Sequence, residues 1–340
     1  MIREAIGTIL AGGSLTQPDA AAVMRQIMDG EATPAQIAAF VVALRMKGET
    51  ADEIAGLASA MRSRAVRIDG DAELDTCGTG GDGASTFNIS TAAAFVAAGA
   101  GVRVAKHGNR AMSSRCGSAD VLEALGVRLD LAPDEVERCL RDAGIGFLFA
   151  PVFHPAMKHA AGPRREIGVR TVFNILGPLC NPAGARAQLL GVAEPSLVET
   201  MAVVLGRLGC RRAMVVHGED GLDEVTLSGR TMVCEVVDGE LRRYVLTPDD
   251  FGLPFVPPGR LAGGSAEDNS MLLRSVLSGE AGPHRDVVVA NAAAAMYVSG
   301  RAAHVRDGAR MAQDVLTSGR ALSRLEQLVA CCSRVAEVAA

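Results

Sequence analysis

A glycine-rich segment near residue 80 is the first place where the residue types suggest chemistry. It reads LDTCGTGGDGASTFNIS over residues 74–90, and four of the six residues from Gly78 to Gly83 are glycine. Glycine at this density costs conformational entropy on folding, so some group must need a close approach to the backbone. The segment lies between an expected strand and an expected helix, where N–H groups and the helix dipole favour a phosphate. A tight turn without a ligand is the alternative.

The P-loop motif does not fit this loop, because GTGGDG lacks the terminal Lys-Ser/Thr of that motif. Because a carboxylate repels phosphate, we expect Asp82 to accept hydrogen bonds from sugar hydroxyls or to shape the turn. Hydroxyl groups that could add hydrogen bonds to a ligand stand at Thr79, Ser85, Thr86, Ser90 and Thr91.

A second polar segment, KHGNRAMSS at residues 106–114, also follows an expected strand. Lys106 offers a point charge to a phosphate, Asn109 offers an amide donor and acceptor, and Ser113 and Ser114 add hydroxyls. An ordinary polar loop is the alternative. His107 could act as a base, although a loop histidine followed by glycine is more often structural.

Four acids lie within six positions of the segment HGEDGLDEV, residues 217–225. They are Glu219, Asp220, Asp223 and Glu224, at the end of an expected strand. Adjacent carboxylates suit Mg²⁺, which keeps much of its water and binds through one or two carboxylates plus substrate phosphates. A solvated acidic turn is the commoner fate of such a run, but two phosphate-like loops elsewhere favour the metal.

Three arginines are candidates for gripping a carboxylate with two parallel hydrogen bonds. Arg164, Arg165 and Arg170 stand in GPRREIGVRTVFNILGPLCNPAG, residues 162–184. Charged positions on an exposed helix are the alternative for most of the three.

The elements that must position these residues fall into two groups. Residues 33–48 and 50–65 each begin with a threonine cap and a capping box, and apolar residues recur there at helical spacing. Strands and helices alternate from about residue 72, which indicates a parallel sheet covered by helices. A hairpin is expected around Asp238-Gly239, and residues 251–270 read as the most loop-like segment.

Composition narrows the function classes. The 340 residues hold 34 Lys plus Arg against 39 Asp plus Glu, a net charge of −5, which argues against a general nucleic-acid binder. We expect no signal peptide, because the N-terminus has no long apolar run, and no membrane span, because the apolar stretches are too short. Eight scattered cysteines without a C-x-x-C pair predict reduced cytosolic thiols and therefore a cytoplasmic location.

Several segments together resemble the anthranilate phosphoribosyltransferase family over nearly the whole chain. They are GTGGD, NIST, KHGNRAMSS, GSADVLEALG, RTVFNILGPLCNPA, the Asp223-Glu224 pair and NAAAAMYVSG. The departures from the family pattern are small. Arg115 and Cys116 stand where Lys and Ser are usual, AAGPRRE replaces VAPVRKE, and Cys180 replaces a common Thr.

The resemblance implies a reaction and an architecture. The amine of anthranilate would displace pyrophosphate from C1 of phosphoribosyl pyrophosphate (PRPP), with Mg²⁺, in tryptophan biosynthesis. It implies a small helical domain at residues 1–66, with a later segment near 155–185 packed on it. It also implies an α/β domain at residues 72–340 with a mainly parallel sheet, and a homodimer formed through the helical domain.

The resemblance also implies site residues, among them Lys106, Asp223 and Glu224 as catalytic residues. Anthranilate would contact Gly78, Asn109 and Arg164, with Arg165 as the rival of Arg164. Mg²⁺ would be served by Ser90, Asp223 and Glu224. The residues implied to contact PRPP are Gly78, Gly81, Asp82, Thr86, Asn88, Ile89, Ser90, Thr91, Lys106, His107, Gly108, Asn109, Arg110, Ala111, Met112, Ser113, Ser114 and Ser118.

Two alternatives remain at the level of sequence. A nucleoside phosphorylase of the same fold class would use phosphate as the nucleophile, and the intact KHGNR and FNILGPLCNP argue against it. A nucleic-acid-binding relative without transferase activity should show a basic stripe, whereas this chain is acidic.

Overall fold

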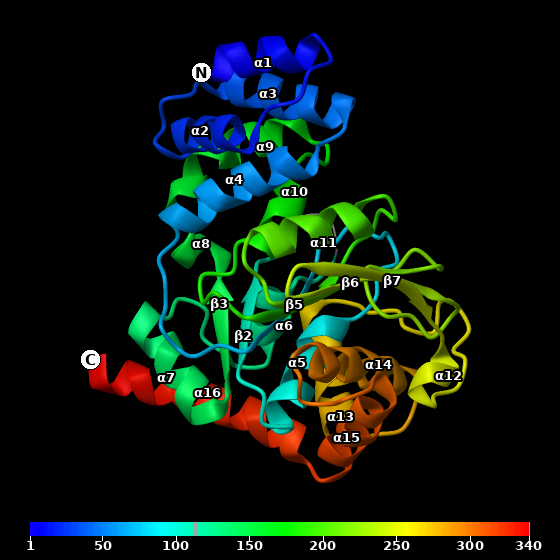
Figure 1. Cartoon of the computed structure of the whole chain (residues 1–340). Helices are drawn as coiled ribbons and strands as arrows, with labels where there is room; N and C mark the ends of the chain where they lie inside the picture. The colour runs from blue at the N-terminus through cyan, green and yellow to red at the C-terminus, as the bar shows by residue number, and fades with distance from the viewer. Residues whose placement is uncertain (112–114, 340) are drawn as a thin grey trace.

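The helical end of the molecule is built from the first 64 residues (Figure 1). The computed structural model describes residues 1–111 and 115–339, apart from the side chains of residues 334–339. Both predicted capping boxes are present, at Thr33 with Gln36 and at Thr50 with Glu53, so these two helix starts are confirmed. The helices are α1 Ile2–Leu10, α2 Gln17–Met28, α3 Pro34–Lys47 and α4 Ala51–Arg64.

A seven-stranded sheet forms the other part of the molecule, in the order β3-β2-β1-β4-β5-β6-β7. The first five strands in this order run parallel, and β6 and β7 pair antiparallel. Asp238 and Gly239 join β6 to β7 with φ values of 47° and 92°, which confirms the predicted hairpin. The strands are β1 Leu74–Gly78, β2 Val104–Gly108, β3 Ile145–Phe149, β4 Ala187–Gly191, β5 Arg212–Gly218, β6 Thr231–Val237 and β7 Glu240–Leu246.

Helices cover the sheet and connect it to the N-terminal helices (Figure 1). Two short 3₁₀ turns, Pro155–Met157 and Gly177–Leu179, flank α9 and α10. The helices are α5 Ile89–Gly99, α6 Ser118–Ala124, α7 Pro133–Ala143, α8 Ala150–Phe153, α9 Lys158–Ile167, α10 Phe173–Leu176, α11 Leu197–Arg207, α12 Pro248–Phe251, α13 Ala266–Leu277, α14 Pro283–Val298, α15 Val305–Thr317 and α16 Arg320–Ala339.

Two hydrophobic cores lie on opposite faces of the sheet, because successive strand residues point to opposite faces. The larger core contains α5 and α14, and the second joins the sheet to α11 and the N-terminal helices. α9 contacts α2 and α3, and α10 contacts α4. From β4 and β5, Leu189, Met214 and Val216 belong to the larger core, whereas Leu190, Ala213 and Val215 belong to the second.

The expected fold class, a helical bundle plus an α/β domain with a mostly parallel sheet, is confirmed. The sequence did not predict β4 or α11. All five residues of β4 are buried, so its AQLLG run shows no polar alternation that would mark a strand. No helix of the described residues is long and apolar enough to cross a membrane.

Candidate active site

The candidate site lies where the carboxyl ends of β1, β2 and β4 meet. The chain passes from β1 to β2 on one side and later returns to β4 on the other, so β1 has parallel neighbours on both sides. In open α/β sheets this change of direction opens a crevice at the carboxyl ends of the strands, and ligands bind there. The glycine-rich segment follows β1, and the segment that begins with Asn109 follows β2.

The glycine loop is crowded by other parts of the protein. A Cβ atom at Gly78 would overlap the Asp223 carboxylate, and one at Gly81 would overlap the Arg170 guanidinium. The N–H of Gly80 donates to Oδ2 of Asp223 at 2.7 Å. Gly80, Gly81 and Gly83 also have positive φ, which other residues adopt at a cost. The glycine count predicted that some group approaches this backbone closely. The structure shows that the side chains of Asp223 and Arg170 do so.

Two of the four acids predicted for the metal face the glycine loop. Oε1 of Glu224 accepts from the N–H of Ser90 at 3.1 Å, at the start of α5. Burial raises the pKa of both Asp223 and Glu224, and neighbouring carboxylates, Asp82 among them, raise them further. The crowding of negative charge in a buried place favours a cation.

The other two acids of the run are held elsewhere. Glu219 forms an ion pair with Arg230, and Asp220 accepts a hydrogen bond from the hydroxyl of Thr226 at 2.7 Å. Within the described residues, no three His, Cys, Asp or Glu side chains gather in an arrangement suited to a metal ion. The candidate ligand set is thus two carboxylates plus the Ser90 hydroxyl, an incomplete set of the kind that Mg²⁺ completes with water and substrate phosphates.

Lys106 lies beneath this loop and is only 2% exposed. Its Nζ donates to the carbonyl oxygen of Thr76 at 2.5 Å and to Oγ of Ser90 at 3.2 Å. Asp75 is fully buried nearby, and burial raises its pKa to about 6, although the charge of Lys106 opposes this. Burial likewise lowers the pKa of Lys106, and the negative charge of Asp75 acts in the opposite direction. The hydrogen bond from the Lys106 ammonium group therefore fixes the position of the Ser90 hydroxyl.

His107 lies in a dry environment at the end of β2. Its Nδ1 lies 3.2 Å from the carbonyl oxygen of Gly177, and burial together with the nearby His154 lowers its pKa to about 3. The ring is therefore neutral at physiological pH.

The segment after His107 folds back on the start of α6. Oγ of Ser118 donates to the carbonyl oxygen of Asn109 at 3.3 Å, and a Cβ atom at Gly108 would overlap Ser118. Arg110 pairs with Asp120 and Glu123, and the N–H of Ala111 donates to Asp120 at 2.9 Å. Met112, Ser113 and Ser114 lie outside the described residues.

A network of amides joins the start of α5 to two other loops. Nδ2 of Asn88 donates to the carbonyl oxygen of Cys116, and Oδ1 of Asn88 accepts from Nδ2 of Asn269 at 3.0 Å. The thiol of Cys116, where the family pattern has Ser, also donates to Oδ1 of Asn88. The sequence offered no signal for Asn269. Thr86, which forms a β-bridge with Ala262, and the buried Ile89 and Thr91 lie in the same stretch.

The structure separates the three candidate arginines. The guanidinium of Arg164 is half-buried, lies 5.3 Å from the ring centroid of Phe173, and has its pKa lowered by burial. Arg165 is exposed. Arg170 instead donates to the carbonyl oxygen of Thr79 in the glycine loop at 3.3 Å.

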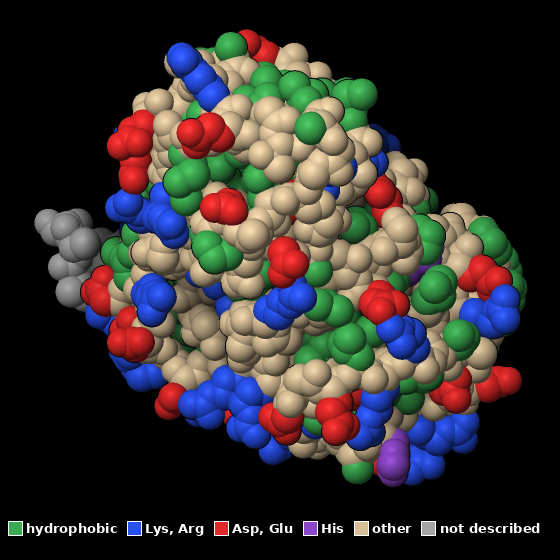
Figure 2. All heavy atoms as spheres, turned by 45° about the horizontal axis from the view of Figure 1, so that its top comes forward, with side chains coloured by type: hydrophobic (Ala, Val, Ile, Leu, Met, Phe, Trp, Pro, Cys, Tyr) green, Lys and Arg blue, Asp and Glu red, His purple; other side chains and the backbone are tan. Residues whose placement is uncertain are grey.

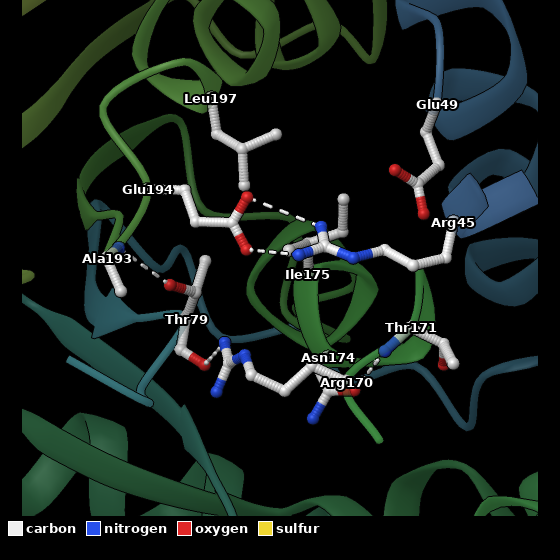
Figure 3. A pocket seen from close by; sticks show the side chains of 10 residues that line it. All are labelled: Arg45, Glu49, Thr79, Arg170, Thr171, Asn174, Ile175, Ala193, Glu194 and Leu197. Atoms are coloured by element: carbon white, nitrogen blue, oxygen red, sulfur yellow. Dashed lines mark hydrogen bonds and ion pairs between the residues drawn. The ribbon is translucent and has the colours of Figure 1, made fainter. Parts of the chain in front are cut away.

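A small polar pocket lies beside Arg170, between the helical end and the sheet (Figure 3). Arg45 from α3 and Glu194 from the segment after β4 form an ion pair across it at 2.9 Å. The hydroxyl of Thr79 accepts from the N–H of Ala193 at 3.2 Å, so the same pocket borders the glycine loop.

Comparisons with known proteins agree with this geometry. Residues 70–322 match the "Glycosyl transferase family, a/b domain", and residues 3–65 match the "Glycosyl transferase family, helical bundle domain". The anthranilate phosphoribosyltransferase of Moorella thermoacetica is 58% identical over 332 residues, which cover 97% of this chain and 98% of that protein.

The chain belongs to the anthranilate phosphoribosyltransferase family. The family member from Anaeromyxobacter sp. (strain K) is 59% identical over 97% of this chain and 98% of its own length. The crystal structure of the family member from Thermus thermophilus has a TM-score of 0.91 at 48% identity, over 97% of this chain and 99% of that one. The family member from Saccharomyces cerevisiae, in complex with PRPP and Mg, has a TM-score of 0.89 at 29% identity, over 98% of each chain.

Proposed function

We propose that this chain transfers the phosphoribosyl group of PRPP to the amine of anthranilate, which gives N-(5-phosphoribosyl)anthranilate and pyrophosphate in tryptophan biosynthesis. The observation that carries the proposal is the meeting of the glycine loop, Lys106 and the Asp223-Glu224 pair at the switch point of the sheet. Membership in the family supports the same reaction over the phosphorylase and nucleic-acid alternatives.

The donor set fits Mg²⁺. Burial raises the pKa of both carboxyl groups, Asp82 also raises that of Asp223, and Asp223 raises that of Glu224, so a divalent cation beside the Ser90 hydroxyl would relieve this repulsion. We assign Ser90, Asp223 and Glu224 to hold it. When bound, Mg²⁺ stabilises negative charge on the diphosphate of PRPP.

The protein's own groups would hold PRPP and stabilise its leaving group. The N-terminus of α5 directs its dipole toward the loop, which favours an anion there. Lys106 adds a buried positive charge beneath Ser90, and charge fixed in a dry site stabilises a developing anion more than charge in water does. Arg170, by its hydrogen bond to Thr79, would keep the loop in place as pyrophosphate leaves.

Arg164 is proposed to hold the carboxylate of anthranilate. Its planar fork of donors matches a carboxylate, and the guanidinium lies over the ring of Phe173, which favours one position for it. The aromatic amine is largely unprotonated at neutral pH, so the reaction needs no obligatory general base. Holding the amine in line with C1 of the ribose supplies much of the rate.

The test is a direct assay of the reaction. Purified protein is mixed with anthranilate, PRPP and Mg²⁺, and anthranilate fluorescence is followed. We expect the fluorescence to fall only when all three are present. Phosphate-dependent release of a base from a nucleoside, with no loss of anthranilate, would overturn the proposal.

A homodimer formed through the helical domain is proposed as the assembly. Leu10 is 74% exposed and Met46 is 83% exposed on α1 and α3, and hydrophobic side chains are visible on this end of the molecule (Figure 2). A symmetric pair is also the commonest oligomer. Sedimentation at micromolar concentration should give twice the chain mass, and a monomer there would contradict the assembly.

We also propose the cytoplasm as the compartment and keep residues 1–66 and 72–340 as the domain division. All eight cysteines are free thiols, which supports a reducing environment. Fractionation of cells that produce the protein tests the location.

A further inference from the structure

Asn291 is a buried polar residue in an apolar stretch of α14. It lies in α14, within the run VVVANAAAAMYV, and its side chain is 0% exposed. Nothing in the chemistry proposed above uses it. An amide in such a place must find partners within the protein, because an unpaired buried amide is costly.

Two hydrogen bonds of Asn291 go to the two backbone groups of one residue, Val225. Oδ1 of Asn291 accepts from the N–H of Val225 at 2.9 Å, and its Nδ2 donates to the carbonyl oxygen of Val225 at 2.9 Å. A second hydrogen bond from Nδ2 reaches the carbonyl oxygen of Val287, one turn earlier in α14. The Asn291 amide is therefore hydrogen-bonded to its own helix and, by two further hydrogen bonds, to the backbone of Val225.

Val225 directly follows Glu224, in the loop between β5 and β6. Because this loop lies outside the sheet ladder, neither backbone group of Val225 has a strand partner. The carboxylates before it are held from the other side, Asp223 by the N–H of Gly80 and Glu224 by the N–H of Ser90. A Cβ atom at Gly191 would overlap the carbonyl group of Asp223, so β4 closes the remaining direction.

We infer that Asn291 is the positioning residue for the carboxylate pair, and that it sets the affinity of the site for a divalent cation. It touches neither metal nor substrate. It acts by fixing the backbone from which Asp223 and Glu224 project, as outer residues of metal sites orient the ligands themselves. The inference depends on the proposed function in one respect only, which is that PRPP is the substrate bound together with the cation.

Loss of the hydrogen bonds to Val225 should lower the affinity for a divalent cation more than it lowers the stability of the fold. We expect Asn291→Ala to reduce divalent-cation affinity by about ten- to a hundredfold, the usual effect of removing an outer residue of a metal site. Asn291→Asp keeps an acceptor for the N–H of Val225 but puts an oxygen opposite its carbonyl oxygen, so it should be at least as harmful. Asn291→Ser, with a shorter donor and acceptor, should keep more affinity than Ala.

The matched control is Val289→Ala. Val289 is also 0% exposed in α14, two residues earlier and therefore about 200° around the helix from Asn291. Val289→Ala removes packing in the same helix but leaves both hydrogen bonds between Asn291 and Val225 in place. Thermal melts compare the stability cost of each variant.

Three measurements on the full-length protein decide the matter. Mn²⁺ alone is titrated and followed by electron paramagnetic resonance, which needs no turnover. Hydrogen exchange is followed in the peptide that contains the N–H of Val225. The Mg²⁺ concentration for half-maximal transfer is measured, with KM for PRPP and for anthranilate.

Support would be weaker Mn²⁺ binding, faster exchange at Val225 and a higher Mg²⁺ requirement in the Asn291 variants, with near-normal values in Val289→Ala. Unchanged Mn²⁺ binding and Mg²⁺ requirement in a folded Asn291 variant, with only a lower melting temperature like that of Val289→Ala, would overturn the inference. If Asn291→Ala does not fold, Asn291→Ser gives the same decision. A wild-type protein that binds Mn²⁺ but transfers nothing would refute the proposed function and leave the first two measurements valid.

Discussion

Two walls of the candidate site are built in different ways. The strand wall comprises residues 76–90 and 223–225, where hydrogen bonds that hold Asp223, Glu224 and Lys106 join parts of the chain at least 30 residues apart. The helical wall comprises α9 and α10, where Arg164 rests on Phe173 and Arg165 points to solvent. Hydrogen bonds fix the strand wall, whereas the helical wall offers a substrate one guanidinium group, that of Arg164.

The difference matches the two substrates expected here. A highly charged diphosphate needs charges and dipoles that are fixed before it binds, because reorganising them would cost free energy in the transition state. A flat aromatic acid needs one oriented carboxylate partner and an apolar surface. We therefore expect changes in the strand wall to act on catalysis and changes in the helical wall to act on affinity for anthranilate.

The largest effect is expected from removing the carboxylate pair. Asp223→Ala combined with Glu224→Ala should abolish turnover at ordinary Mg²⁺, because no other carboxylate of the acidic run faces the loop. The fold should survive, since the change also removes the repulsion between two half-buried acids. Steady-state assays over a range of Mg²⁺ concentration, together with a thermal melt, provide the check.

The same acidic run offers the control. Glu219→Ala removes an acid that pairs with the exposed Arg230, so its activity should stay near that of the wild type. A double variant of Asp223 and Glu224 with unchanged rate and unchanged Mg²⁺ dependence would mean that the strand wall does not hold the metal.

A smaller but still large effect is expected from crowding at Gly78. In Gly78→Ala the new methyl group would overlap the Asp223 carboxylate and push it away from the N–H of Gly80. We expect kcat/KM for PRPP to fall by roughly ten- to a hundredfold, as for other displaced supports of a metal site.

Gly83→Ala separates crowding from backbone strain. Gly83 has φ of 71° but nothing within 4 Å of a Cβ atom, so the variant should lose about 1–2 kcal/mol of stability and little activity. Equal losses of kcat/KM in the two variants would show that loop conformation, and not the position of Asp223, limits the reaction.

The strand wall was easier to predict from sequence than its supports. Its glycines, hydroxyls and paired acids stand out locally, and the strands before them end in glycine. The supports come from far along the chain. Asn291 lies 66 residues from its partner and Asn269 lies 181 residues from Asn88, so no local spacing could connect them. Arg170 stood out, but as a carboxylate ligand, because sequence could not show that it reaches Thr79.

A moderate effect confined to one substrate is expected at Arg164. Losing a charge-assisted hydrogen bond costs about 1.5–3 kcal/mol, or roughly ten- to a hundredfold, and should appear mainly in KM for anthranilate. PRPP binding should barely change in Arg164→Ala. Arg165→Ala is the matched control and should leave both values unaltered, because that side chain is exposed. A raised anthranilate KM in Arg165→Ala alone would show that the wrong arginine was chosen.

The smallest effect is expected at the ion pair between the helical end of the molecule, on which α9 packs, and the sheet, which carries the strand wall. Arg45 and Glu194 link α3 to the segment after β4, but their side chains are 44% and 39% exposed (Figure 3). Exposed pairs contribute about 0–1 kcal/mol, since water screens them and two long side chains must be ordered. Arg45→Ala should therefore lower the melting temperature by no more than about 2–4 °C.

A double-mutant cycle with Glu194→Ala isolates the energy of this pair from other effects of each change. We expect a coupling energy below about 1 kcal/mol in melts and a change in kcat/KM of less than about fivefold. A coupling above about 2 kcal/mol would show that this pair fixes the helical wall against the strand wall. The proposed difference between the strand wall and the helical wall would then be wrong, because both walls would respond to a mutation together.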